Sequence, residues 1–149
     1  MMIWPECSFY DKALALYEAE DNQEGIARIN NESGVVFRDK GDYKTANERF
    51  EKSLGIQRHR NDSVGIGYSL EFLGYNQLLI KDYKKSESYL QEALSIRKKL
   101  KDKFALMLTL KKAMMWRRKS TSPTYKSITM GRSWRIMNLL TIFHRPTKA

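Results

Sequence analysis

The sequence repeats itself with a period of forty residues. The triplet Asp42-Tyr43-Lys44 returns as Asp82-Tyr83-Lys84. In the same register, Gly34 aligns with Gly74, Phe50 with Leu90, Ser53 with Ala93, Leu54 with Leu94, and Ile56 with Ile96. The match also extends toward the amino terminus, so the unit is present about two and a half times. Such a period is typical of an array in which each unit buries its apolar face only by stacking on the next.

Each unit is predicted to form two helices. Apolar residues such as Ile66, Leu70 and Leu73 recur at the three- and four-residue spacing of a helix. Residues that can cap a helix amino terminus precede every segment after the first, namely Asn22, Asp42, Asp62, Asp82 and Asp102. The predicted helices span residues 7–20, 23–39, 43–59, 63–80, 83–100 and 103–118. We therefore expect an all-α fold, a superhelical solenoid of antiparallel hairpins.

The small and aromatic positions of the unit resemble those of the tetratricopeptide repeat family. That family places a small residue and then an aromatic one in the first helix, followed by a small-aromatic-small series in the second. The corresponding residues here are Gly34, Phe37, Ala46, Phe50 and Ser53, and the next copy reads Gly74, Gln77, Ser86, Leu90 and Ala93. The unit is longer than the usual one of about 34 residues, similar to long-helix variants found in signalling and scaffold proteins. The family's proline is replaced by Arg58 and Lys98.

Charge divides the chain into two parts. The net charge is +10, yet residues 1–102 hold 16 Lys and Arg against all 17 acids. Residues 103–149 hold the other 11 basic residues and no acid. We expect a repeat array over residues 1–118, followed by a basic tail over residues 119–149 that is poorly ordered or forms a short capping helix.

Both ends of the array look cut. The chain begins on a second helix, and the pattern stops inside a first helix, at Met114. We therefore expect a fragment of a longer repeat protein. For the tail we retain three explanations: a frameshifted end, a disordered segment, or an amphipathic segment that caps the array or lies on a membrane surface. Because no polar cap is evident at either end, we expect marginal stability or self-association.

The sequence offers no arrangement typical of an enzyme, a cofactor site or a metal site. His59 and His144 lie in unrelated segments, and Cys7 has no further ligand at a suitable spacing. Glycine-rich phosphate-binding motifs are absent. A single cysteine, no signal peptide and no apolar run of about 18 residues favour a cytoplasmic protein without a membrane span.

The resemblance implies a module that binds a protein or peptide in a concave groove, in signalling or regulation. In this family the first helix of each unit lines the groove. Carried onto this chain, the groove residues are Arg28, Asn31, Val35, Arg38, Tyr68, Glu71, Tyr75, Leu78 and Lys111, together with Leu108 and Met115. The alternative is a binder of nucleic acid or of an anionic membrane surface that acts through the basic tail. The neutral repeat region makes nucleic acid the less favoured partner.

A chaperone carboxyl-terminal tail is not expected as the ligand. Family members that grip such a tail use Asn, Asn and Lys at three groove positions. This chain has Val35, Phe72 and Leu108 there. The expected ligand is instead an extended or helical segment of a signalling partner.

Overall fold

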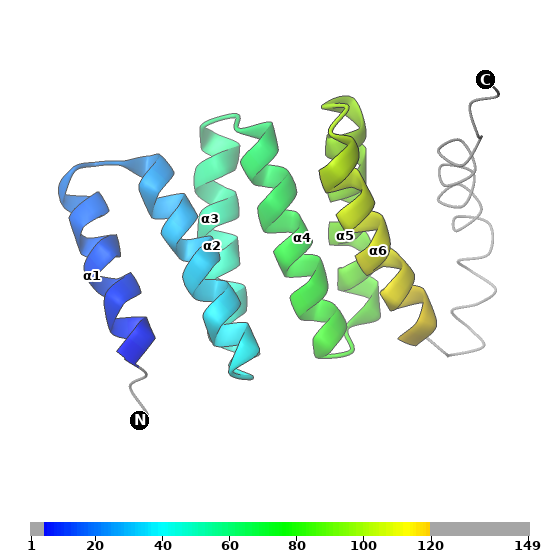
Figure 1. Ribbon diagram of the computed structural model, residues 1–149, viewed down its shortest axis with the longest axis horizontal. Coiled ribbons are helices and arrows are strands. Elements are labelled where there is room, and N and C mark those ends of the chain that lie inside the picture. Colours follow the sequence, from blue (N-terminus) through cyan, green and yellow to red (C-terminus); the bar gives the residue numbers. More distant parts are fainter. Residues whose placement is uncertain (1–4, 120–149) are drawn as a thin grey trace, which may run out of the picture.

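Residues 5–119 fold into six helices that follow one another side by side, with successive helices antiparallel (Figure 1). The computed structural model describes residues 5–119, with side chains from Ser8 to Met115. The helices are α1 (Pro5–Ala19), α2 (Gln23–Asp39), α3 (Tyr43–His59), α4 (Ser63–Leu79), α5 (Tyr83–Lys99) and α6 (Lys103–Lys119). No strand occurs among residues 5–119. The predicted all-α array is confirmed, and every helix boundary lies within two residues of its predicted place.

The same three-residue turn joins each helix to the next. Its middle residue has a positive φ: 49° at Asp21, 86° at Gly41, 54° at Asn61, 65° at Lys81 and 56° at Lys101. The third residue begins the next helix, because the Asp42 carboxylate accepts a hydrogen bond from the Thr45 N–H at 3.1 Å. The Asp42 N–H donates to the Phe37 carbonyl at 2.9 Å and so closes the preceding helix. The backbone therefore repeats every 20 residues, although the side-chain pattern repeats every forty.

Glycine lets the two helices of each unit approach closely. A Cβ atom added at Gly34 would lie 2.6 Å from the Phe50 ring, and one added at Gly74 would lie 2.7 Å from Cγ of Leu90. Across the second contact, the Ser86 hydroxyl donates to the Gly74 carbonyl at 2.7 Å. The small positions of the repeat are thus packing positions, as the sequence predicts.

The main apolar core lies between the two layers of helices. Its buried residues are Ala46, Phe50, Leu54, Leu70, Leu73 and Ala93. Helix α2 packs mainly on α3, and α4 packs mainly on α5. In Figure 1, α3 and α5 lie behind α2, α4 and α6. The first helices of the units therefore form one face of the array. Our expectations for residues 120–149 fall outside the described residues.

Candidate partner-binding groove

A pocket of about 640 Å³ opens between α2 and α4. We call it the α2–α4 pocket. Its lining residues are Tyr10, Glu24, Ala27, Arg28, Asn31, Glu32, Val35, Val36, Gln57, Arg60, Asp62, Val64, Gly65, Tyr68 and Phe72. Most of them lie on the two first helices, which the 20-residue backbone repeat places side by side (Figure 1). The pocket combines an apolar wall with charged residues of both signs.

Four of the nine predicted groove residues line this pocket. They are Arg28, Asn31, Val35 and Tyr68. Tyr68 is 41% exposed, and its ring stacks on Phe72 with ring centroids 6.5 Å apart. Arg28 donates a hydrogen bond to the Tyr17 hydroxyl at 2.7 Å. Its guanidinium is therefore held at the edge of the pocket by α1.

The other five predicted residues lie outside the lining of the pocket. The guanidinium of Arg38 lies over the ring of Tyr75, 5.0 Å from the centroid. Lys111 is exposed on α6. For Glu71 and Leu78 the predicted placement on an open surface is wrong, because they are only 3% and 1% exposed.

Leu78 and Glu71 are buried because neighbouring helices cover them. Leu78 packs with Leu90 of α5 and Ala113 of α6 in a small core cluster. Glu71 is covered by polar side chains from α5 and α6. Glu71 and Leu78 of α4 were predicted to contact a ligand, but they contact other helices instead.

A neutral polar cluster closes the floor of the pocket. The Ser69 hydroxyl donates to Oε1 of Gln57 at 2.6 Å and lies 3.1 Å from both Oδ1 of Asn31 and Oγ of Ser53. Ser69 and Ser53 are fully buried, and the other two residues are at most 8% exposed. Side chains from α2, α3 and α4 thus meet at one point. Their mutual hydrogen bonds offset the cost of burying polar groups.

A charged cluster occupies the equivalent place in the next unit. Glu71, Arg97 and Thr109 lie forty residues after Asn31, Gln57 and Ser69. Arg97 forms a buried salt bridge with Glu71 and donates to the Ala105 carbonyl at 2.8 Å. The Thr109 hydroxyl donates to Oε2 of Glu71 at 2.8 Å, and Lys112 bonds the other carboxylate oxygen. This cluster ties α4, α5 and α6 together.

Two cations keep Glu71 ionised despite its burial. Burial alone would raise the pKa of this carboxyl. The hydrogen bond from Lys112 and the positive charges of Lys112 and Arg97 outweigh that effect, so the pKa of Glu71 lies below its ordinary value. The negative charge of Glu71 is thus balanced by the positive charges of Arg97 and Lys112.

Cations resting on aromatic rings continue along this face. The Lys112 ammonium lies 5.7 Å from the Phe72 centroid and 5.6 Å from that of Tyr75. The guanidinium of Arg97 lies 4.9 Å from the Tyr68 centroid. These contacts orient the aromatic side chains of α4. Arg97 and Lys112 therefore hold in place the rings of Tyr68 and Phe72, which line the α2–α4 pocket.

Several pocket residues were not predicted from the sequence to contact a partner, although Phe72 was assigned to a groove position. Val64 and Phe72 flank Tyr68 at four-residue spacing on α4, and this helical spacing was a usable signal. No local sequence pattern indicates that Glu24 and Arg60 belong to the pocket. They meet across 36 residues of sequence, where the Arg60 guanidinium donates to Glu24 at 3.1 Å.

Among the described residues, no group of three or more His, Cys, Asp or Glu side chains is placed to hold a metal ion. No helix of residues 5–119 is both long and apolar enough to cross a membrane.

Comparisons with known proteins identify the repeat. The family model for the tetratricopeptide repeat matches residues 25–99, which is half of the chain and includes α3, α4 and α5. No curated protein matches the chain. The matched segment contains the close contacts of Gly34 with Phe50 and of Gly74 with Leu90. The chain belongs to the tetratricopeptide repeat family.

Proposed function

We propose that the chain binds a segment of a partner protein in the α2–α4 pocket. Tetratricopeptide repeats generally mediate binding between proteins and are non-catalytic scaffolds. A pocket of about 640 Å³ is large enough to take one or two side chains of such a segment. The groove residues Arg28, Val35 and Tyr68 then contact the partner, joined by Val64 and Phe72, while Asn31 lies in the buried floor of the pocket.

The observation that carries this proposal is an accessible apolar wall inside the pocket. Val64 is 52% exposed and Tyr68 is 41% exposed, and both belong to its lining. An exposed aromatic side chain in a concave site is a frequent anchor of protein interfaces. The charged residues Glu24, Arg28, Glu32 and Arg60 surround the wall. This arrangement suits a partner segment with an apolar anchor flanked by polar residues.

The chemistry of the pocket disfavours a chaperone carboxyl-terminal tail as the ligand. Phe72 lies at a position that would need Asn, and its ring stacks on Phe50 with centroids 5.4 Å apart. An aromatic ring held in this way cannot donate a hydrogen bond to a carboxylate. The proposed partner is therefore an internal segment, extended or helical, of a cytoplasmic signalling or regulatory protein. The similarity to long-helix repeats of signalling proteins supports this choice.

Affinity for selected peptides tests the proposal. A displayed library of random peptides is selected on the purified protein, and the tightest peptide is titrated against Val64→Ser and Tyr68→Ala variants. We expect each variant to weaken binding at least roughly tenfold, as loss of an anchor does. The matched control is Ile80→Ser, because Ile80 is 47% exposed but lies outside the pocket. Equal losses in Val64→Ser and Ile80→Ser would overturn the assignment.

Salt dependence separates this proposal from the alternative based on the basic tail. The described pocket carries charges of both signs, so its affinity should change little between low and physiological salt. Binding of a polyanion by the 11 basic residues of positions 103–149 would fall steeply with salt. Titrations of the selected peptide and of a DNA oligonucleotide at two salt concentrations measure both.

A further inference from the structure

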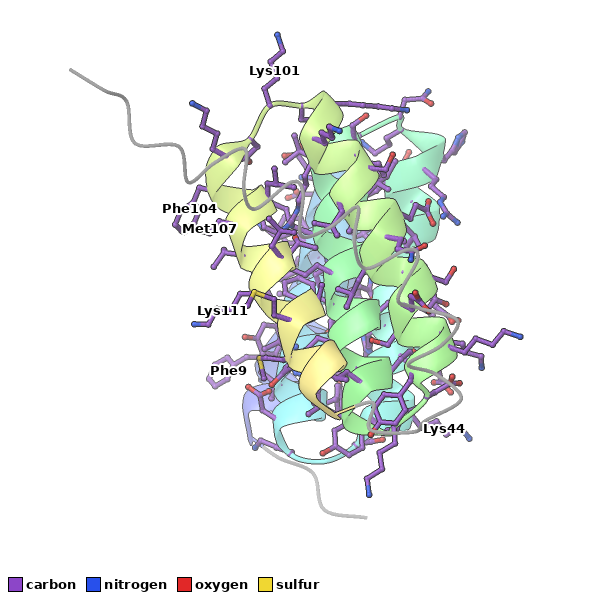
Figure 2. All side chains as sticks on the ribbon, turned by 90° about the vertical axis from the view of Figure 1, so that its right-hand side faces the viewer. Phe9, Lys44, Lys101, Phe104, Met107 and Lys111 are labelled. Atoms are coloured by element: carbon purple, nitrogen blue, oxygen red, sulfur yellow. The ribbon has the colours of Figure 1, made fainter. Side chains whose placement is uncertain are left out.

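Exposed apolar side chains gather on the first and the last helix. Phe9 and Leu16 of α1 are 73% and 67% exposed, and we call them the α1 face. Phe104, Met107 and Met114 of α6 are 67%, 59% and 44% exposed. Together with Lys111 they form the α6 face. Figure 2 shows Phe104, Met107 and Lys111 projecting from one edge of α6. Such surfaces are typical of sites that contact another protein.

The repeat shows what each face would contact inside a longer array. Phe9 and Leu16 correspond to Tyr89 and Ile96 of α5, eighty residues later, and those two residues pack on the main core. Inside the array, this side of a second helix is therefore covered by the preceding unit.

The α6 face is the side that receives a following helix. Met114 corresponds to Gly34 and Gly74, which lie against Phe50 and Leu90 of the next helix. Phe50 and Leu90 themselves correspond to Tyr10 of α1, whereas Phe9 and Leu16 correspond to residues that pack on the core formed with the preceding second helix. If α1 of another copy followed α6 as α3 follows α2, it would therefore turn Tyr10 toward Met114 and the α1 face toward α5.

The two ends of the array also carry opposite charges. Residues 5–21 contain five acids and one basic residue, whereas residues 103–119 contain six basic residues and no acid. This complementarity favours contact of one end with the other and disfavours contact between like ends.

We propose that the chain associates head to tail, with α1 of one copy stacked on α5 and α6 of the next. The two contacting faces differ, so a dimer still presents one free face at either end and can add further copies. Met114 stands where the array has glycine, so the helices meet through side chains at a wider spacing than α2 and α3. The contact is therefore weaker than those within the array.

Sedimentation of the purified full chain, without any ligand, tests the proposal. We expect the average mass to rise with concentration and to pass beyond that of a dimer. Phe9→Ser and Met107→Ser should each weaken association roughly tenfold. Ile80→Ser should not, because Ile80 is equally apolar and exposed at 47% but lies on neither face. A mass independent of concentration would overturn the proposal.

Charge reversal tests the pairing of the two faces. Glu18→Lys with Glu20→Lys makes the α1 end basic, and Lys103→Glu with Lys111→Glu makes the α6 end acidic. Each double variant alone should associate roughly tenfold more weakly than the wild type. An equimolar mixture of the two should recover association, since each altered face then meets a face of opposite charge. Failure of the mixture to recover, with both variants folded, would contradict head-to-tail pairing.

The matched charge control is Glu48→Lys with Lys52→Glu on α3, where both residues are exposed. It should leave the sedimentation profile unchanged. Because no peptide is present, these results do not depend on the function proposed for the α2–α4 pocket.

Discussion

At the scale of single residues, the second unit replaces a neutral cluster by a charged one in the same three positions. Asn31, Gln57 and Ser69 become Glu71, Arg97 and Thr109. The resemblance to the repeat family placed Glu71 among the groove residues, and glutamate is also rarely buried in proteins. Its partners lie 26, 38 and 41 residues away. Only the stacking of α5 and α6 on α4 brings them together, so no local pattern could reveal the burial.

Removal of the buried charge should destabilise the fold at neutral pH. Glu71→Gln leaves Arg97 without its counter-charge, and we expect a loss of about 3 kcal/mol in the free energy of unfolding at pH 7. The folded state holds the pKa of Glu71 below its ordinary value of 4.5. The carboxylate therefore contributes fully above that value and loses its contribution as the pH falls through the lower folded-state pKa.

Urea denaturation of wild type and variant at neutral and acidic pH measures this effect. The difference between the two proteins should shrink as the pH falls below 4.5. Glu51→Gln on α3 is the control, because Glu51 is exposed and should change stability by less than about 0.5 kcal/mol. A difference that stays constant across this pH range would contradict an ionised Glu71.

Copying the neutral cluster into the second unit should reverse much of this loss. The triple variant Glu71→Asn, Arg97→Gln and Thr109→Ser carries the residues of the first unit. Because it buries no unpaired charge, it should be more stable than Glu71→Gln alone. Thermal unfolding of both variants checks this order. A triple variant that is the less stable of the two would show that the clusters are not interchangeable.

At the scale of the helices, boundaries were predictable because the signals are local. Capping residues occur every 20 residues, and the side chain of Asp62 accepts from the Gly65 N–H at 3.0 Å as expected. In the turn between α2 and α3, Gly41 has a positive φ, which glycine adopts readily. Asp21 and Asn61 have the same conformation, which Asp and Asn adopt occasionally. At Lys81 and Lys101 it was not predictable, because lysine rarely adopts it without a surrounding structure that imposes it.

Alanine at two glycines should have opposite effects. A Cβ atom at Gly74 would lie 2.7 Å from Leu90, so Gly74→Ala should cost about 1 to 3 kcal/mol of unfolding free energy. Gly55 has no atom within 4 Å of such a Cβ, so Gly55→Ala should add about 0.5 to 1 kcal/mol. Urea midpoints measure both. Shifts of the same sign would mean that the α4–α5 contact is looser than the structure shows.

The turns offer a second pair of opposite effects. Lys81 has a φ of 65°, which favours glycine, so Lys81→Gly should stabilise the chain by about 0.5 to 1 kcal/mol. Gly41→Ala places a Cβ atom at a φ of 86° and should destabilise it by about 1 kcal/mol. Melting temperatures of the two variants test the common turn geometry. Destabilisation by Lys81→Gly would indicate a side-chain role for that lysine instead.

At the scale of the whole molecule, the array presents two kinds of surface. The pocket lies between the first helices α2 and α4, and the apolar end faces lie on α1 and α6. The sequence predicted the array, because the period is visible in the residues themselves. It predicted the pocket in part: Arg28, Asn31, Val35 and Tyr68 line it. Leu78 could not be placed, because its burial depends on Ala113, which lies 35 residues later on α6.

Binding of a peptide between α2 and α4 can be measured by the amide chemical shifts of the isotope-labelled full chain, recorded as the selected peptide is added. We expect the largest shifts on α2 and α4, at amides around the pocket such as Ala27, Asn31 and Tyr68. The amide chemical shifts of exposed positions on the second helices, such as Gly55 and Ser95, should not change. Largest shifts on α3 and α5, or within residues 120–149, with the pocket amides unchanged, would contradict binding in the pocket.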